Sequence, residues 1–80
     1  MLDAVNMQRK VVGIKQLRKS LKEGQVVRAF VAENAVPNLT DPLVEECARL
    51  GVELIMVPTM AELGKAFGIS VGAAAAGLLA

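Results

Sequence analysis

Residues 13–32 read GIKQLRKSLKEGQVVRAFVA, and the change of pattern within this stretch decides the fold. In the first half, apolar residues recur at intervals of three and four, which is the spacing of one helix face. Gly24 then supplies a left-handed helix stop, and the following residues form a nearly continuous apolar run typical of a covered strand. The stretch therefore predicts a helix over residues 15–23 and a buried strand over residues 26–32. The inward side chains of the helix are Ile14, Leu17 and Leu21.

Helix and strand signals continue to alternate along the rest of the chain. Asp41 and Pro42 predict a helix start, with aspartate as the cap and proline at the first helical position. Thr59 and Glu62 have the spacing of a capping box. Before the deciding stretch, we expect a short helix with Leu2, Val5 and Met7 and an extended piece at Val11 and Val12. After it, we expect a turn over residues 33–38 and a helix over residues 42–50, which ends at Gly51 and has an inward stripe of Leu43, Cys47 and Leu50. The remaining expected elements are a strand over residues 52–57, a helix over residues 60–67 that ends at Gly68, and a strand over residues 71–79.

The last of these segments has two interpretations. Four consecutive alanines at residues 73–76 favour a helix, whereas Gly72 and Gly77 weaken one, and we expect a strand. Strands separated by helices of about ten residues indicate an α/β fold. We expect a three-layer α-β-α sandwich with a small mixed four-stranded sheet, formed by residues 1–80 as a single domain.

The composition excludes most catalysis by side chains. The 80 residues contain no histidine, tyrosine or tryptophan and one cysteine, so a Ser-His-Asp site, a His-containing zinc site and an internal disulfide cannot form. Cys47 has no basic neighbour in sequence that would lower its pKa, and we expect a structural thiol. Glu45 and Glu46 point about 100° apart on a helix, which predicts two surface side chains and no acid–base pair. No catalytic residue, metal or cofactor is expected.

Charge is divided unevenly along the chain. The formal net charge is +1, but residues 9–28 hold seven cations against Glu23 alone, a net +6, and the other residues carry a net −5. Clustered cations of this kind suit a polyanionic partner, while a solvated helix face with chance clustering is the plainer interpretation. On a helix, four of the cations share one sector of about 100°: Lys15, Arg18, Lys19 and Lys22.

The start of this helix favours an anion. Gly13 has no side chain to block a close approach, and the free N–H groups and positive dipole end point the same way as Lys15. Lysine and arginine would contact phosphates and the Gln16 amide a base edge, although simple helix solubility explains Gln16 equally well. Phe30 and Phe67 lie in apolar patterns that predict core, so aromatic stacking on single strands is disfavoured and structured RNA is the better polyanion.

Two separated motifs resemble a known family. The motifs are Gly13-Ile14-Lys15-Gln16-Leu17-Arg18-Lys19, followed by Gly24, and Leu63-Gly64-Lys65-Ala66-Phe67-Gly68-Ile69-Ser70-Val71-Gly72-Ala73-Ala74-Ala75, with the acidic, proline-containing turn from Val31 to Pro37 between them. They resemble the L7Ae family of kink-turn RNA-binding ribosomal proteins, and above all its small bacterial branch. The resemblance implies an α-β-α sandwich that docks its second helix into the widened major groove of a kink-turn, an RNA internal loop with tandem sheared G·A pairs and a sharp bend.

The resemblance also implies roles for residues of that helix. Gly13 would permit close approach, and Lys15 and Gln16 would face the G·A bases. Archaeal members have an Asn-Glu pair in place of Lys15 and Gln16; losing that carboxylate removes an acceptor for guanine edges and adds a positive charge, so salt sensitivity should rise. Further contacts would come from Lys19, to a base edge and the backbone, and from Arg18 and Lys22, to phosphates.

Residues outside the helix are implied as well. Glu33 matches an acidic position near the RNA-facing loops. Ile69, Ser70 and Val71 match the loop that covers the base flipped outward at the bend. The implied partner is a kink-turn in ribosomal or regulatory RNA, with the ribosome as a candidate partner, bound by a monomer without catalysis.

Two further expectations concern location and the alternative function. The first nine residues show no secretory signal, and the apolar end of the chain is shorter than the roughly 20 residues of a spanning helix, so we expect a cytoplasmic protein without membrane contact. A protein-interaction module whose basic helix docks on an acidic partner explains the charge asymmetry equally well. An enzyme is the weakest possibility, because no nucleophile, base and orienting group occur together.

Overall fold

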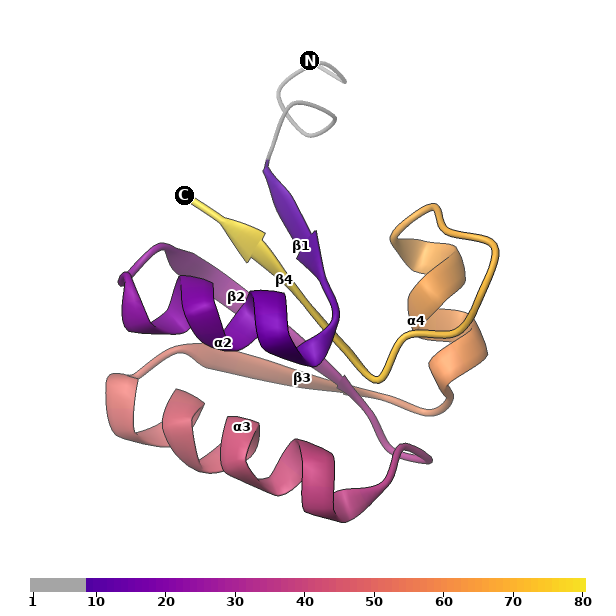
Figure 1. Ribbon diagram of the computed structural model, residues 1–80, viewed down its shortest axis with the longest axis horizontal. Helices are drawn as coiled ribbons and strands as arrows, with labels where there is room; N and C mark the ends of the chain where they lie inside the picture. The colour runs from indigo at the N-terminus through magenta and orange to yellow at the C-terminus, as the bar shows by residue number, and fades with distance from the viewer. Residues whose placement is uncertain (1–8) are drawn as a thin grey trace.

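The computed structural model describes residues 9–80, in which strands and helices alternate (Figure 1). The sheet has the order β1-β4-β2-β3, with β2 parallel to β3 and antiparallel to β4, and β1 antiparallel to β4. The mixed four-stranded sheet is therefore as expected, while the helix expected at Leu2, Val5 and Met7 lies outside the described residues. The elements are β1 (Lys10–Val12), α2 (Ile14–Lys22), β2 (Val26–Ala32), α3 (Pro37–Leu50), β3 (Glu53–Val57), α4 (Met60–Ala66) and β4 (Ala75–Leu79).

Helices cover both faces of the sheet, which confirms the three layers (Figure 1). α2 and α3 cover one face, where Leu17 and Leu43 are fully buried. α4 covers the other face through Leu63, which is also fully buried. The consecutive residues Ala75 and Ala76 of β4 belong to different clusters, because successive side chains of a strand point to opposite faces. This central strand is thus buried on both sides.

The last segment is a strand, as predicted, but the strand begins four residues later than expected. β4 starts at Ala75, and residues 71–74 form a loop. The Ala73 N–H donates to the Met60 carbonyl at 3.0 Å. This hydrogen bond ties the segment to α4, and pairing with β2 begins only at the Ala74 carbonyl, which accepts from the Ala32 N–H at 2.9 Å.

α3 begins earlier than the sequence suggested. Its first residue is Pro37, after Val36, and Pro42 lies inside the helix. A proline costs least at the first helical position, where no hydrogen-bond donor is needed, and Pro37 meets that condition. The Thr40 N–H already donates to the Val36 carbonyl at 3.3 Å. The predicted cap at Asp41 is therefore wrong, because the chain offers two prolines and the first starts the helix.

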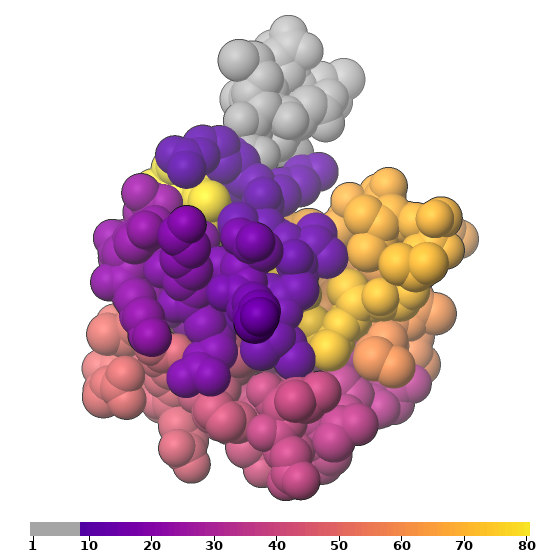
Figure 2. Space-filling model, in the orientation of Figure 1, coloured from indigo at the N-terminus to yellow at the C-terminus, as the bar shows by residue number. Residues whose placement is uncertain are grey.

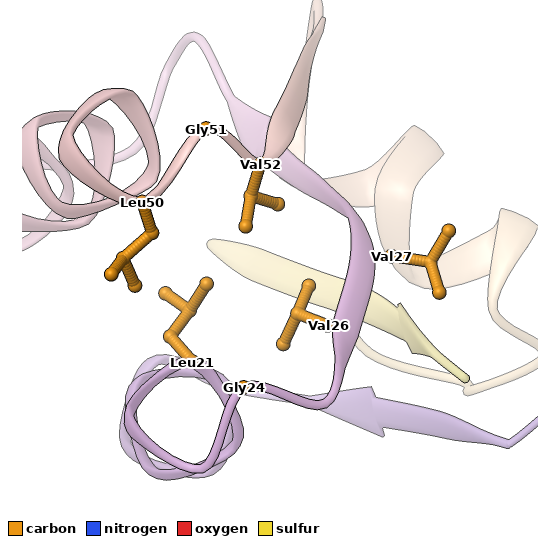
Figure 3. Close-up of a pocket in the computed structure, with 7 residues that line it drawn as sticks. All are labelled: Leu21, Gly24, Val26, Val27, Leu50, Gly51 and Val52. Atoms are coloured by element: carbon orange, nitrogen blue, oxygen red, sulfur yellow. The ribbon is translucent and has the colours of Figure 1, made fainter.

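The inner face of α3 agrees only partly with the predicted stripe. Leu43 and Cys47 are buried as expected, whereas Leu50 is 48% exposed. Figure 3 shows Leu50 directed towards the same space as Leu21 and Val52, between the C-terminal ends of α2 and α3. That space is an open pocket, so Leu50 faces its neighbours and still meets solvent.

Thr59 caps α4 as predicted, although only one of the two reciprocal hydrogen bonds of a capping box is present. The Thr59 Oγ1 accepts a hydrogen bond from the Glu62 N–H at 3.1 Å and donates to Glu62 Oε2 at 3.2 Å. α4 ends at Ala66, and Gly68 adopts a φ of 77°. Local sequence signals thus fix both ends of this short helix.

Replacement of Thr59 by alanine is expected to lower the free energy of unfolding by about 1 kcal/mol, because the Glu62 N–H loses its acceptor. Urea unfolding followed by circular dichroism measures this loss. Thr59→Ser keeps the hydroxyl and should retain most of the stability. Equal losses in the two variants would contradict a capping role.

Candidate nucleic-acid interface

α2 carries its cations along one exposed side. Leu17 and Leu21 are buried against the sheet, so the other side of the helix faces solvent. This side forms a shallow, open depression. The residues that line it are the four cations of the predicted RNA-binding set: Lys15, Arg18, Lys19 and Lys22.

Gly13 fixes the position of the start of α2. Its φ is 103°, a conformation that L side chains rarely adopt, and its N–H donates to the Ala75 carbonyl at 2.8 Å. A Cβ at Gly13 would meet nothing within 4 Å, so the space in front of the glycine is open. Gln16 lies exposed in the first turn of α2. The helix therefore presents an unobstructed N-terminal end beside the start of β4.

The loop between α4 and β4 is folded back on α4. The Ile69 N–H donates to the Gly64 carbonyl at 3.0 Å. Ile69 is partly buried and packs against the cluster under α4, while Ser70 is exposed and Val71 is 68% exposed. Of the three predicted loop residues, one anchors the loop and two project into solvent.

The loop and the start of α2 meet at the same end of the sheet. The Ala74 carbonyl, at the end of the loop, accepts a hydrogen bond from the Ala32 N–H at 2.9 Å. The next carbonyl, that of Ala75, accepts from the Gly13 N–H. Glu33 follows β2 directly and is exposed. Figures 1 and 2 show α2 and the loop on one face of the molecule, on either side of the start of β4. The structure thus places Gly13, Glu33 and the C-terminal end of the loop at the same end of the sheet, while Lys22 lies at the far end of α2.

Arg18 also faces a buried carboxylate that the sequence did not predict. The Glu46 side chain is 8% exposed, and its Oε1 lies 3.7 Å from the Arg18 Nε, while Oε2 lies 3.7 Å from the Arg49 Nη2. The Oε1 atom has no hydrogen-bond partner. The expectation of a surface position is right for Glu45 and wrong for Glu46, because α2 packs against this flank of α3.

Comparison with known proteins identifies the family. Residues 1–79 match the model of the Ribosomal protein L7Ae/L30e/S12e/Gadd45 family. The chain belongs to this family. An RNA-binding protein of Geobacillus sp. (strain WCH70) is 42% identical over 69 residues, which are 86% of this chain and 84% of the relative. The large ribosomal subunit protein eL8 of Halobacterium salinarum is 38% identical over 69 residues, which are 85% of this chain and 58% of that protein.

Solved structures confirm the fold. The 15.5kD RNA binding protein of Giardia lamblia superposes with a TM-score of 0.83 at 22% identity, over 89% of this chain and 60% of that protein. A Bacillus halodurans protein of unknown function superposes with a TM-score of 0.78 at 22% identity, over 86% and 69% of the two chains. At this level of identity the likeness concerns the fold alone.

Other features of this L7Ae-family chain supply packing rather than chemistry. The rings of Phe30 and Phe67 meet edge to face with centroids 5.4 Å apart, and both pack against the cluster under α4, as expected for core. Cys47 is buried as predicted; burial, and then the charge of Glu46, raises the pKa of its thiol.

Among residues 9–80, no three metal-ligating side chains come together, and no helix is long and apolar enough to cross a membrane.

Proposed function

We propose that this chain is a non-catalytic, cytoplasmic RNA-binding protein that recognises and stabilises kink-turns, with the ribosome as a candidate partner. One observation carries the proposal: four cations line a single depression on a helix whose glycine start lies beside the α4–β4 loop. Family membership and the names of the RNA-binding and ribosomal relatives support it. The alternative of an acidic protein partner would use the same cations, and neither the family nor the names of the relatives support it.

Binding would stabilise the bent form of the RNA. A kink-turn exchanges between extended and bent forms, and a protein that fits only the bent form shifts the population by its difference in affinity. Four cations would neutralise phosphates that the bend brings together: Lys15, Arg18, Lys19 and Lys22. The exposed amide of Gln16 would set the register by hydrogen bonds to base edges. This function requires no chemical step.

The α4–β4 loop would cover the base that the bend flips outward. Val71 is 68% exposed although it is apolar, so burying it under a base would remove apolar surface from water. Ser70 beside it offers a hydroxyl to the base or sugar. Ile69 holds the loop on the core, and Glu33 presents a carboxylate at the same end of the sheet.

Replacement of Lys19 by alanine is expected to weaken binding to a kink-turn duplex by about 1–3 kcal/mol, because a contact to a base edge and phosphate is lost. A gel-shift titration measures the change. Lys10→Ala, which removes an exposed cation of β1 outside the depression, is the matched control. Unchanged affinity of the Lys19 variant would remove α2 from the binding surface.

Kink-turn recognition itself is tested with two RNAs. The unmodified protein is titrated with a kink-turn duplex and with the same duplex carrying disrupted G·A pairs. Tighter binding to the intact kink-turn supports the proposal. Equal binding would indicate electrostatic attraction without recognition of the bend.

A further inference from the structure

Arg18 differs from the other cations of the depression in having a protein partner. Its Nε lies 3.7 Å from Oε1 of Glu46, whereas within residues 9–80 Lys15, Lys19 and Lys22 take part in no ion pair. The Arg18 side chain is nevertheless 47% exposed and lines the depression. One guanidinium group therefore has one edge near α3 and another edge facing solvent.

The contact with Glu46 is made by the Nε of Arg18, so the two terminal amino groups of the guanidinium remain free. A guanidinium is a planar group whose five N–H donors have a fixed arrangement, so holding the Nε edge also sets the direction of the two terminal amino groups. Those amino groups can form paired hydrogen bonds with a phosphate. Arg18 can thus face Glu46 and an RNA phosphate at the same time.

The fold gains little from Glu46. A buried carboxylate is unfavourable unless it is well paired, yet both of its arginine contacts are 3.7 Å long and its Oε1 accepts no hydrogen bond. An apolar side chain of similar length would avoid the cost of burying a charge at this position. Incompletely satisfied polar groups of this kind are expected where function, not stability, determines the residue.

We propose that Glu46 is a positioning residue for RNA binding. Its carboxylate lies 3.7 Å from the Arg18 Nε and, by charge attraction without a hydrogen bond, keeps this edge turned towards α3, so that the terminal amino groups face a phosphate of the bound RNA. This inference rests on the proposed RNA-binding function and adds α3 to the binding machinery. A negative charge near bound phosphates would by itself weaken binding, so its removal should strengthen binding. For Glu46 we expect the opposite: removal of the carboxylate should weaken RNA binding.

The test compares two substitutions that change the net charge equally. Glu46→Gln removes the buried carboxylate, and Glu45→Gln removes the exposed one beside it, so each raises the net charge from +1 to +2. Gel-shift titrations with the kink-turn duplex should show a 3- to 10-fold loss for Glu46→Gln and no loss for Glu45→Gln. The salt slope of Glu46→Gln should fall by about 0.7–0.9, the value of one phosphate contact.

Three further measurements separate positioning from a structural role. Glu46→Met, which keeps the side-chain length without the charge, should unfold at the same or a higher temperature than the unmodified protein while binding RNA as weakly as Glu46→Gln. In an Arg18→Gln background, Glu46→Gln should cause no additional loss. In the RNA-free protein, the ¹⁵N signal of the Arg18 Nε–H should remain distinct in Glu45→Gln and move to the position of solvated arginines in Glu46→Gln.

Three results would overturn the inference: binding by Glu46→Gln that equals or exceeds that of Glu45→Gln, an additional loss in the Arg18→Gln background, or loss of RNA binding only in proportion to unfolding. Failure of the proposed function has a different signature, because the unmodified protein would then bind intact and G·A-disrupted duplexes equally. In that case the same variants still report whether Glu46 directs Arg18 to RNA phosphates.

Discussion

Replacing Gly64 by alanine is expected to lower the free energy of unfolding by about 3 kcal/mol and to abolish tight RNA binding. A Cβ at this position would overlap the carbonyl oxygen of Val71 and would lie 3.1 Å from its carbonyl carbon and 3.2 Å from the Cα of Gly72. These are backbone atoms, so no change of side-chain rotamer can relieve the overlap. The loop would have to leave α4, and Ser70 and Val71 would move with it.

The sign of this effect distinguishes it from helix propensity. Alanine is favoured over glycine inside a helix by about 1 kcal/mol, so a Gly64→Ala change governed by propensity would stabilise the protein. Ala61→Gly, at an exposed position of the same helix, is the control and should cost about 1 kcal/mol through propensity alone. Urea unfolding measures both variants. A Gly64→Ala protein as stable as the unmodified chain would show that the loop does not depend on this contact.

Gly64 also illustrates which features the sequence could not predict. The residue appears in the family-like motif, but its role depends on a loop seven residues later that crosses the helix. The late start of β4 has the same origin, because the Ala73 N–H is bound to α4. Propensity and periodicity describe each segment separately and contain no information about such crossings.

The basic side of α2 was predictable for the opposite reason. Its apolar period, its glycine stop and its four cations are all local, and the structure places them as the sequence indicated. The position of Glu46 in the sequence of its helix predicts a surface residue, and the packing of α2 on α3 buries its side chain. Sequence thus predicted the cationic surface, while the carboxylate behind Arg18 required the tertiary structure.

The triple substitution Lys15→Gln, Lys19→Gln and Lys22→Gln is expected to weaken kink-turn binding at least 100-fold, about 3 kcal/mol. It removes three of the four cations that line the depression and leaves Arg18 and Glu46 in place. All three lysines are exposed, so the fold should be retained. In a gel-shift or fluorescence titration at several salt concentrations, the salt slope should fall by about 2.1–2.7, because three phosphate contacts each contribute about 0.7–0.9.

The decisive control removes the same number of cations elsewhere. Arg9, Lys10 and Arg28 are exposed and lie outside the depression, and replacing them by glutamine changes the net charge from +1 to −2, as the lysine variant does. Long-range attraction depends on total charge and would fall equally in both variants, whereas direct phosphate contacts are lost only from α2. If both variants bound equally weakly, RNA would be attracted by the chain as a whole, and α2 would have no special part in binding.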